Sequence, residues 1–212
     1  AAELLSREDL NNLIDKVRET SPRLVDELIP NAMTMGTLHN VLTLLLEERV
    51  PVTNLARILE ALSSQTAVTQ DSIQLADHVR EVLAQAICEP FLDQERRLHA
   101  IVLEPALELQ LRQSLHEGKL VLHPQSMEKF IVQVATLVRQ AGQEKRGVAL
   151  LVDGALRRPL RDLLVRPLPD LSVLAYAEVP GDMLLEADAT IRFEEVSSGV
   201  DQEDPVSVSE ES

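Results

Sequence analysis

Hydrophobic side chains recur at helical spacing through the first ninety residues. The first stripe follows the i, i+3, i+4, i+7 pattern of one helix face and comprises Leu10, Leu13, Ile14 and Val17. Just before it, Ser6 and Asp9 stand three residues apart, as in a capping box. In a capping box the Ser hydroxyl oxygen accepts a hydrogen bond from a backbone N–H that has no partner within the helix. An acidic side chain in the first turn also interacts favourably with the helix dipole. We therefore expect a helix that begins directly after Ser6.

Four more helices are expected before residue 92. The pattern predicts them near residues 23–29, 37–48, 54–62 and 71–89. Pro30 and Pro51 interrupt the pattern, and Pro90 disfavours helical geometry in the residue before it. Thr53 is expected to cap the helix over residues 54–62. The pattern thus predicts a helical subdomain over residues 1–92.

After about residue 95, short apolar runs alternate with helical patterns. The candidate strands read LHAIVLE, KLVLHP, GVALLVDG, LSVLAYAEV and ADATIRF. Between them, a helix is expected to open at Pro105 and close at Gly118, and an amphipathic helix spans residues 127–142. Strands that alternate with helices predict a small layered α/β subdomain over residues 93–193. The fold class expected for the whole chain is therefore α+β.

The chain is strongly acidic, with a formal net charge of -15. From Glu194 onward it carries seven acids and no Lys or Arg, which predicts a disordered acidic tail over residues 194–212. Without this tail, 28 acidic residues face 20 basic ones and the net charge is -8. Such a balance argues against broad binding of nucleic acid or of anionic lipid, because clustered Lys and Arg provide both affinities.

Cysteine use and hydropathy indicate the compartment. Cys88 is the only cysteine, so an intramolecular disulfide is excluded and a reducing compartment is favoured. No N-terminal signal peptide is recognisable, and the apolar runs fall far short of the ~18 residues that a membrane span needs. We therefore expect a soluble, cytoplasmic polypeptide.

Positive charge gathers in the segment ALRRPLRDLLVR, residues 155–166. Its leucines are expected to face inward, which leaves Arg157, Arg158 and Arg161 mostly on the outer side of a helix. Arginines grouped in this way can bind carboxylates of a partner protein bidentately. An ordinary solvated face that pairs with nearby acids is the competing interpretation.

Two other functions can be weighed against docking. Asp153 follows a predicted strand, where α/β proteins place catalytic or Mg²⁺-binding carboxylates, and Glu104 is the acid that could join it. This allows a phosphoacceptor or Mg²⁺-dependent enzyme, although a cap on the following helix explains Asp153 more simply. The stretch LLLEERVPVTNLARILEAL could form a helix-turn-helix, but the acids around Arg57 oppose binding to DNA phosphates.

The sequence shows no motif for a metal, a cofactor or catalysis. The histidines lack metal-binding spacing and are expected at the surface or the core boundary: His39, His78, His99, His116 and His123. Cys88 is expected to act as a small hydrophobic residue on a helix face. No glycine-rich phosphate loop is present. We therefore expect no enzymatic activity, no cofactor and no metal site.

Three long segments resemble the cytoplasmic region of the bacterial export gate family. They read TLHNVLTLLLEERVPVTNLARILEAL, VREVLAQAIC and ALRRPLRDLLVRPLPDLSVLAYAEVP, in the family's order and spacing. The family includes the large flagellar export membrane protein (FlhA) and its injectisome counterparts of the InvA and LcrD type. The resemblance covers about residues 4–193 and leaves open whether a flagellum or a type III secretion injectisome is involved.

The resemblance implies that this chain corresponds to the third and fourth cytoplasmic subdomains of such a gate. A membrane part and two earlier subdomains would lie outside it, so the chain would reach the bacterial inner membrane only through that missing part, at its cytoplasmic face. The implied partners are other copies in a homo-oligomeric ring, usually of nine subunits, export substrates with their chaperones, and other export components. No nucleic acid is implied.

The resemblance also suggests which residues make contacts. The helical third subdomain is associated with ring contacts, and many relatives carry a basic residue where this chain has Thr53. The ring-contact candidates are Arg49, Thr53, Arg57 and Glu60. The partner-binding candidates remain Arg157, Arg158 and Arg161.

Overall fold

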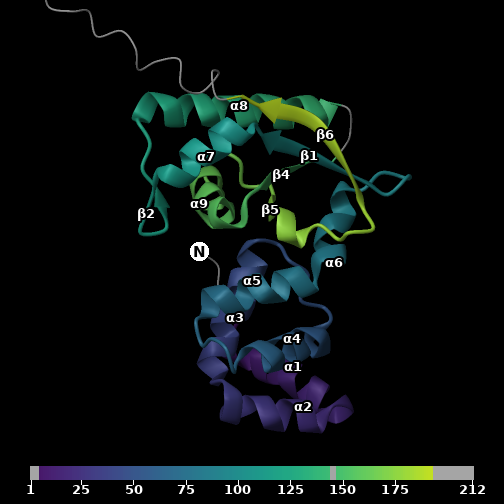
Figure 1. Cartoon of the computed structure of the whole chain (residues 1–212). Helices are drawn as coiled ribbons and strands as arrows, with labels where there is room; N and C mark the ends of the chain where they lie inside the picture. Colours follow the sequence, from purple (N-terminus) through teal and green to yellow (C-terminus); the bar gives the residue numbers. More distant parts are fainter. Residues whose placement is uncertain (1–4, 144–146, 193–212) are drawn as a thin grey trace, which may run out of the picture. The chain divides into compact units, whose positions relative to one another are not determined.

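The computed structural model describes residues 5–143 and 147–192 and has a mixed helical and sheet fold, which confirms the α+β class (Figure 1). It divides the chain into two compact units. The first unit comprises Ala1–Pro90 with Ala177–Pro180, and the second comprises Phe91–Tyr176 with Gly181–Ser212. The predicted acidic tail, residues 194–212, lies outside the described residues.

The expected second subdomain ran without interruption from residue 93 to 193, but residues 177–180 belong to the first unit. The physical reason is one buried carboxylate. Glu178 is only 2% exposed, and its side chain accepts hydrogen bonds from Arg80 of the first unit. A pairing across 98 positions of sequence cannot be inferred from local pattern.

The first unit is built from helices. Their bounds are α1 Arg7–Thr20, α2 Pro22–Glu27, the π-helical turn η1 Leu28–Ala32, α3 Met35–Glu47, α4 Leu55–Gln65, α5 Ser72–Val82 and α6 Ala84–Cys88. The predicted stripes face inward, and the side chains of Leu10, Ile14, Leu42 and Ile58 are fully buried. The start of α1 is as expected: Asp9 N–H donates to Ser6 Oγ and Ser6 N–H to the Asp9 carboxylate, both at 3.1 Å.

Two expectations about these helices were wrong. Asn54, not Thr53, caps α4: its Oδ1 accepts from Arg57 N–H at 3.2 Å, as a strong N-cap residue does. The single helix expected over residues 71–89 is broken at Leu83, where φ is -92° and ψ is 10°. The break coincides with a long-range donor, because the Arg57 guanidinium binds the Val82 carbonyl at 3.0 Å and satisfies a helix-end acceptor.

The second unit is a parallel sheet with helices. Its elements are β1 Arg97–Leu103, α7 Pro105–Gln113, β2 Leu115–His116, β3 Lys119–Leu120, α8 Pro124–Gln143, β4 Ala149–Val152, α9 Gly154–Leu164, β5 Val173–Ala175 and β6 Leu184–Ile191. The short turns η2 Glu89–Phe91 and η3 Tyr176–Glu178 each include residues of both units. The main sheet has the order β5-β4-β1-β6 with all neighbours parallel. Parallel neighbours require crossover connections, and helices provide those from β1 to β4 and from β4 to β5.

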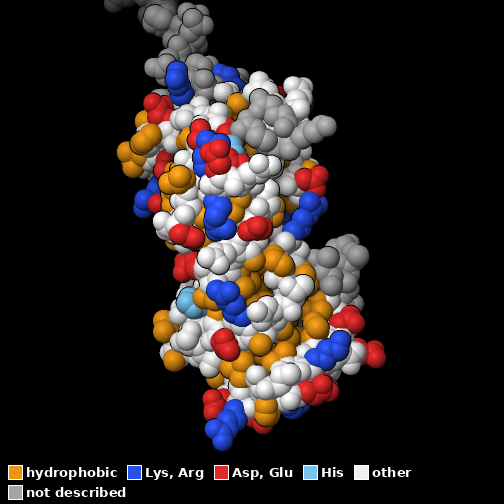
Figure 2. Space-filling model, turned by 90° about the vertical axis from the view of Figure 1, so that its right-hand side faces the viewer, with side chains coloured by type: hydrophobic (Ala, Val, Ile, Leu, Met, Phe, Trp, Pro, Cys, Tyr) orange, Lys and Arg blue, Asp and Glu red, His pale blue; other side chains and the backbone are white. Residues whose placement is uncertain are grey.

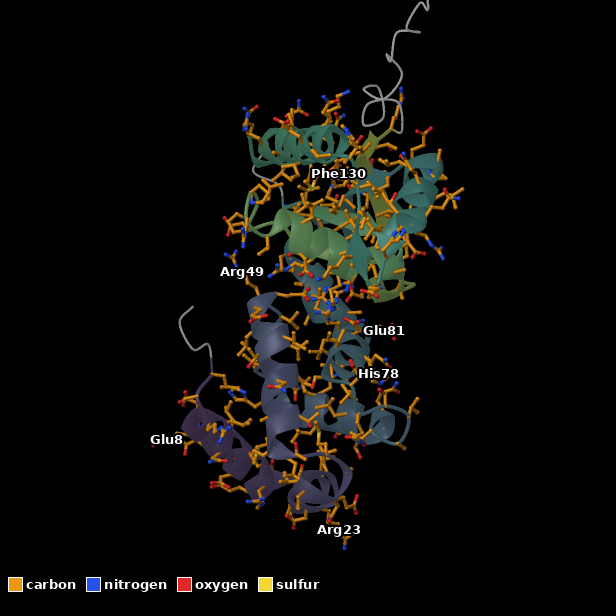
Figure 3. All side chains as sticks on the ribbon, turned by 90° about the vertical axis from the view of Figure 1, so that its left-hand side faces the viewer. Glu8, Arg23, Arg49, His78, Glu81 and Phe130 are labelled. Carbon is orange, nitrogen blue, oxygen red and sulfur yellow. The ribbon has the colours of Figure 1, made fainter. Side chains whose placement is uncertain are left out.

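One hydrophobic core joins the helices α7, α8 and α9 to the sheet. Phe130, the largest fully buried side chain, points from α8 into this unit (Figure 3). It shares the core with Leu107, Leu150 and Leu160 from α7, β4 and α9. Apart from Phe130, the buried residues of this core are aliphatic.

Two further expectations were wrong in the second unit. The run KLVLHP forms only the two-residue strand β3, paired with β2 in a hairpin. Gly118 does not close a helix, because α7 already ends at Gln113. Instead Glu117 and Gly118 form the hairpin turn with φ angles of 50° and 75°. Two consecutive left-handed residues favour a tight hairpin turn, which the helical reading of this stretch overlooked.

The pairing of β1 with β6 contains an irregularity. Ala100 pairs with Ala187 but Ile101 pairs with Ala189, so Asp188 is an extra residue in β6. A bulge of this kind redirects the side chain that it carries. It therefore determines where the Asp188 carboxylate lies.

Candidate functional site

The carboxyl end of β4 holds Asp153 in a structural role. Its Oδ1 accepts from Ala155 N–H at 2.9 Å, which confirms that Asp153 caps α9. Its own N–H donates to Glu108 Oε1 at 2.6 Å, and Arg112 lies 3.3 Å from its Oδ2. Glu104 is the acid that the sequence suggested as a second carboxylate beside Asp153. It precedes α7, and its backbone N–H donates to the Ile191 carbonyl at 2.9 Å.

This end of the sheet also carries the only tyrosine of the chain. Tyr176 follows β5 and is 44% exposed. Burial of part of its ring raises the pKa of the Tyr176 phenol, and the charges of Glu108 and Asp153 raise this pKa further. The phenol is therefore neutral at physiological pH and can donate a hydrogen bond.

The arginines of α9 do not all face outward. Arg157 is 3% exposed, whereas Arg158 and Arg161 are half-buried. Arg157 stands seven positions before the buried Leu164, and residues at i and i+7 share a helix face. The prediction that all three lie on the outer side was therefore wrong for Arg157. Figure 2 shows acidic and basic side chains interspersed on one side of the second unit, upper in that view, without a broad basic patch.

The four ring-contact candidates follow α3 or lie around the start of α4. Arg49 directly follows the C-cap of α3 with a φ of 58°, and it projects from one end of the helical unit (Figure 3). Thr53, Arg57 and Glu60 lead into α4 or lie in its first turns, and all four side chains are exposed. Arg57 and Glu60 share a face of α4 because they are three positions apart. The structure thus places this set at the surface.

Sequence reasoning missed a buried charge cluster in the first unit. Arg80, 3% exposed, donates from Nη1 to Glu48 Oε2 at 3.0 Å and from Nη2 to Glu178 Oε2 at 3.2 Å. Its Nε donates to the other Glu178 oxygen, which completes a bidentate pair. One signal was available, because Arg80 falls on the apolar face of its helix, four positions after the buried Ala76.

Cys88 lies beside this cluster. It is buried, as expected for a small hydrophobic residue, and its Sγ donates to the Glu178 carbonyl oxygen at 3.3 Å. Burial raises the pKa of the Cys88 thiol to about 11, and the neighbouring Glu178 charge contributes to the rise. Because the thiolate is the reactive form, this cysteine is chemically inert in the folded unit.

A second charge cluster lies between β1 and β6 in the second unit. His99 is 6% exposed, so the expectation that it lies at the surface or the core boundary was wrong. Its Nδ1 lies 2.8 Å from Asp188 Oδ1, and its Nε2 lies 3.3 Å from Asp93 Oδ2. The β6 bulge accounts for the position of Asp188, and no sequence pattern marks that bulge.

Asp93 is held in its charged form. The backbone N–H of Arg97 donates to it at 2.9 Å and the Arg97 guanidinium at 2.8 Å. The backbone N–H of Arg97 is the largest cause of a lowered pKa of the Asp93 carboxyl, which falls to about 2. The Arg97 guanidinium, His99 and the backbone N–H of Glu95 lower this pKa further, whereas partial burial raises it. The cluster fastens the turn before β1 to the strand.

Within the two described ranges, no group of three or more His, Cys, Asp or Glu side chains is arranged to hold a metal ion. Within the same ranges, no helix is long and apolar enough to cross a membrane. Of the contact candidates, the four residues around α4 are exposed, and Arg158 and Arg161 on α9 are half-buried.

Comparison with known proteins places this architecture in a class. The FHIPEP family matches residues 1–183, and the chain therefore belongs to that family. The flagellar biosynthesis protein FlhA of Escherichia coli K12 is 35% identical over 193 residues, which cover 90% of this chain and 28% of FlhA. The chain thus spans somewhat more than a quarter of the length of this relative.

Solved structures share the fold. The nonameric EscV cytosolic domain from the type III secretion system superposes with a TM-score of 0.74 at 24% identity, over 88% of this chain and 56% of that one. The Chlamydia pneumoniae CdsV protein, solved as a complex with CdsO, gives 0.73 at 21% identity over 88% and 56% of the two chains. The resemblance to the flagellar and type III export gate family is thereby confirmed.

Proposed function

We propose that this chain is the docking and ring-forming cytoplasmic part of a bacterial export gate, which receives export substrates and substrate–chaperone complexes. The observation that carries the proposal is the FHIPEP match over residues 1–183. The 35% identity to FlhA over 90% of this chain supports a role in protein export, flagellar or of type III secretion. In this proposal the chain acts at the cytoplasmic face of the inner membrane.

Ring formation is the first element of the proposal. Its support is that a relative with the same fold is nonameric, and that Arg49 after α3 and Thr53, Arg57 and Glu60 around the start of α4 are all exposed. We assign these four side chains to the contact between neighbouring copies. Opposite charges on Arg49 and Glu60 allow one copy to present a base where the next presents an acid.

Docking of other polypeptides is the second element. Arg158 and Arg161 are the candidates for binding acidic groups of a chaperone or another export component, since guanidinium groups pair with carboxylates bidentately. Arg157 is withdrawn from this role because it is buried. A relative solved in complex with CdsO supports a protein partner for this kind of domain.

The chain works, in this proposal, without catalysing a reaction. The main support is that Asp153 is engaged by Ala155, Glu108 and Arg112 in a capping arrangement. Incubation with Mg²⁺ and acetyl phosphate, followed by intact mass measurement, tests this directly. A mass increase of one phosphoryl group that disappears in Asp153→Asn would contradict the proposal.

Export itself is tested in the source bacterium. The codons for Arg49 and Arg57 are changed to Glu in the chromosomal gene, and secreted flagellar or type III proteins are measured in the medium and in the cell. We expect secretion to fall at least about tenfold while synthesis continues, as loss of a central interface contact predicts. Secretion at the wild-type level would remove the ring-contact assignment.

A matched control separates this effect from charge reversal in general. Arg23 is exposed on α2, at the end of the helical unit away from Arg49 (Figure 3). Arg23→Glu changes the charge by the same amount per site and should leave secretion unchanged. If Arg23→Glu reduces secretion as strongly, the loss reflects net charge and not the proposed contact.

A further inference from the structure

The connection between β5 and β6 has an unusual place in the fold. It leaves the second unit after Tyr176, contributes Ala177–Pro180 to the first unit, and returns at Gly181. We call these four residues, 177–180, the strap. Because of the strap, the chain passes between the two units at three places, at residues 90–91, 176–177 and 180–181.

The strap has little apolar surface with which to stay in place. Ala177 is exposed and Val179 and Pro180 are half-buried, so Glu178 is the one fully buried side chain of the four. Segments with few buried apolar contacts open at much lower free energy than the core around them. What holds this segment must therefore come largely from the polar contacts of Glu178.

Those contacts are specific. The Glu178 carboxylate receives two N–H groups of Arg80, and the Glu178 carbonyl accepts from Cys88 Sγ at 3.3 Å. The remaining nitrogen of the guanidinium, Arg80 Nη1, donates to Glu48, which follows α3 and is not part of the strap. Arg80 is thus shared between a carboxylate of the helical unit and a carboxylate of the strap.

We propose that residues 177–180 are a detachable strap, which Arg80 holds on the helical unit and which opens as a local unit without unfolding of the helices. The sharing of Arg80 makes release feasible, because the guanidinium keeps Glu48 as a counterion when Glu178 leaves. Once the strap has left the helical unit, the chain passes between the two units only at residues 90–91. This inference does not depend on the proposed export function.

Cys88 provides the readout. It is the only cysteine, it is buried, and its thiol donates a hydrogen bond to the strap. Alkylation of Cys88 therefore reports opening of the strap. The purified 212-residue protein is treated with iodoacetamide at pH 8, and the mass increase is followed with time. In the wild type we expect slow modification, because the pKa of the buried thiol, about 11, leaves little thiolate at this pH.

Two matched variants test the proposal. Glu178→Gln removes the charge of the strap from Arg80, and Glu48→Gln removes the charge of the helical unit from the same guanidinium. Because loss of the Glu178 charge also lowers the pKa of Cys88, the rates are compared per thiolate, from their pH dependence. On this scale we expect Cys88 to be alkylated about 10- to 100-fold faster in Glu178→Gln, since a hydrogen bond to a charged group has this weight. Glu48→Gln should change the rate much less. Equal acceleration in both variants would overturn the proposal, because the effect would then follow general destabilisation.

Hydrogen exchange on the wild-type protein tests the proposal without any variant. Hydrogen exchange is followed in the peptide that covers residues 177–179 and in α4, at increasing sub-denaturing urea concentrations. The strap amides should exchange through an opening with weak urea dependence, well before those of α4. If strap and α4 exchange together, through global unfolding alone, the strap is a fixed part of the helical unit.

Discussion

Each unit of this protein contains a basic side chain between two acids, and the two clusters differ in instructive ways. In the helical unit, Arg80 joins Glu48 and Glu178, with side chains exposed by at most 9%. In the α/β unit, His99 lies between Asp93 and Asp188, whose side chains are 21% and 12% exposed. Arg80 carries a permanent charge, whereas an imidazole donates to both acids only when both nitrogens carry protons.

The comparison indicates that burial decides how much such a cluster contributes to the free energy of unfolding. A charge without a counterion is costly in a dry interior, so both acids of the Arg80 cluster depend on Arg80 for their burial. The acids of the His99 cluster are more exposed, so water can replace a lost partner there. Loss of the central base should therefore cost more in the first cluster than in the second.

The largest expected effect is loss of the shared cation. Arg80→Ala leaves Glu48 and Glu178 buried without the guanidinium, and we expect the free energy of unfolding to fall by about 3–5 kcal/mol. Urea denaturation followed by circular dichroism measures the change. A loss below about 1 kcal/mol, the level of an exposed ion pair, would show that the two carboxylates find water or other donors.

An intermediate effect is expected for the histidine. His99→Ala removes the donor to Asp188 and the contact with Asp93, and a destabilisation of about 1–3 kcal/mol should follow. His99→Asn keeps one donor and should recover part of the loss in the same denaturation experiment. If His99→Ala costs as much as Arg80→Ala, the distinction between the two clusters is wrong.

Acid should weaken the second cluster by a predictable route. The folded-state pKa of Asp93, about 2, lies below its ordinary value of 3.8, so the folded protein binds this proton less tightly than the unfolded chain does. The contribution of Asp93 is therefore complete above pH 3.8 and is lost as the pH falls toward 2.

Asp93→Asn tests this route. The variant should be less stable than the wild type at pH 6, and the difference between the two should shrink as acid is added. Urea denaturation at a series of pH values between 6 and 2.5 measures it. A difference that stays constant over this range would show that the Asp93 charge does not contribute to stability.

The smallest effect provides the baseline for both clusters. Arg18 pairs with Asp15 at 3.1 Å, but the side chains are 45% and 67% exposed. We expect Arg18→Ala to change the free energy of unfolding by no more than about 0.5 kcal/mol. A larger change would mean that partial burial is not what separates weak from strong ion pairs in this protein.

Local pattern predicted much of the fold. The stripe of α1 and its Ser6–Asp9 capping box are formed as expected, because both depend on contacts within one turn of helix. The buried strand β4 follows from an uninterrupted apolar run. The capping role of Asp153 was likewise foreseeable from its position between a strand and a helix.

The errors arose where distant residues interfere with local preference. The helix over residues 71–89 breaks where Arg57, far away in sequence, binds the Val82 carbonyl. The error at Arg157 is of another kind, because its position on α9 coincides with that of the buried Leu164 and is set by local helical spacing. For the candidate site, the exposure of the four residues around α4 and the half-burial of Arg158 and Arg161 are known from the structure alone.

The sequence by itself determined the helical and strand periods and the family to which the chain belongs. The periods depend on residues close together in the chain, and the family match extends over residues 1–183. The tertiary structure alone decided which charges meet. Arg80 and Glu178 are 98 positions apart, and His99 and Asp188 are 89 apart. Such pairs depend on how the sheet is ordered, where β6 bulges and where the chain returns to the first unit. These follow from packing of the whole chain and leave no local pattern.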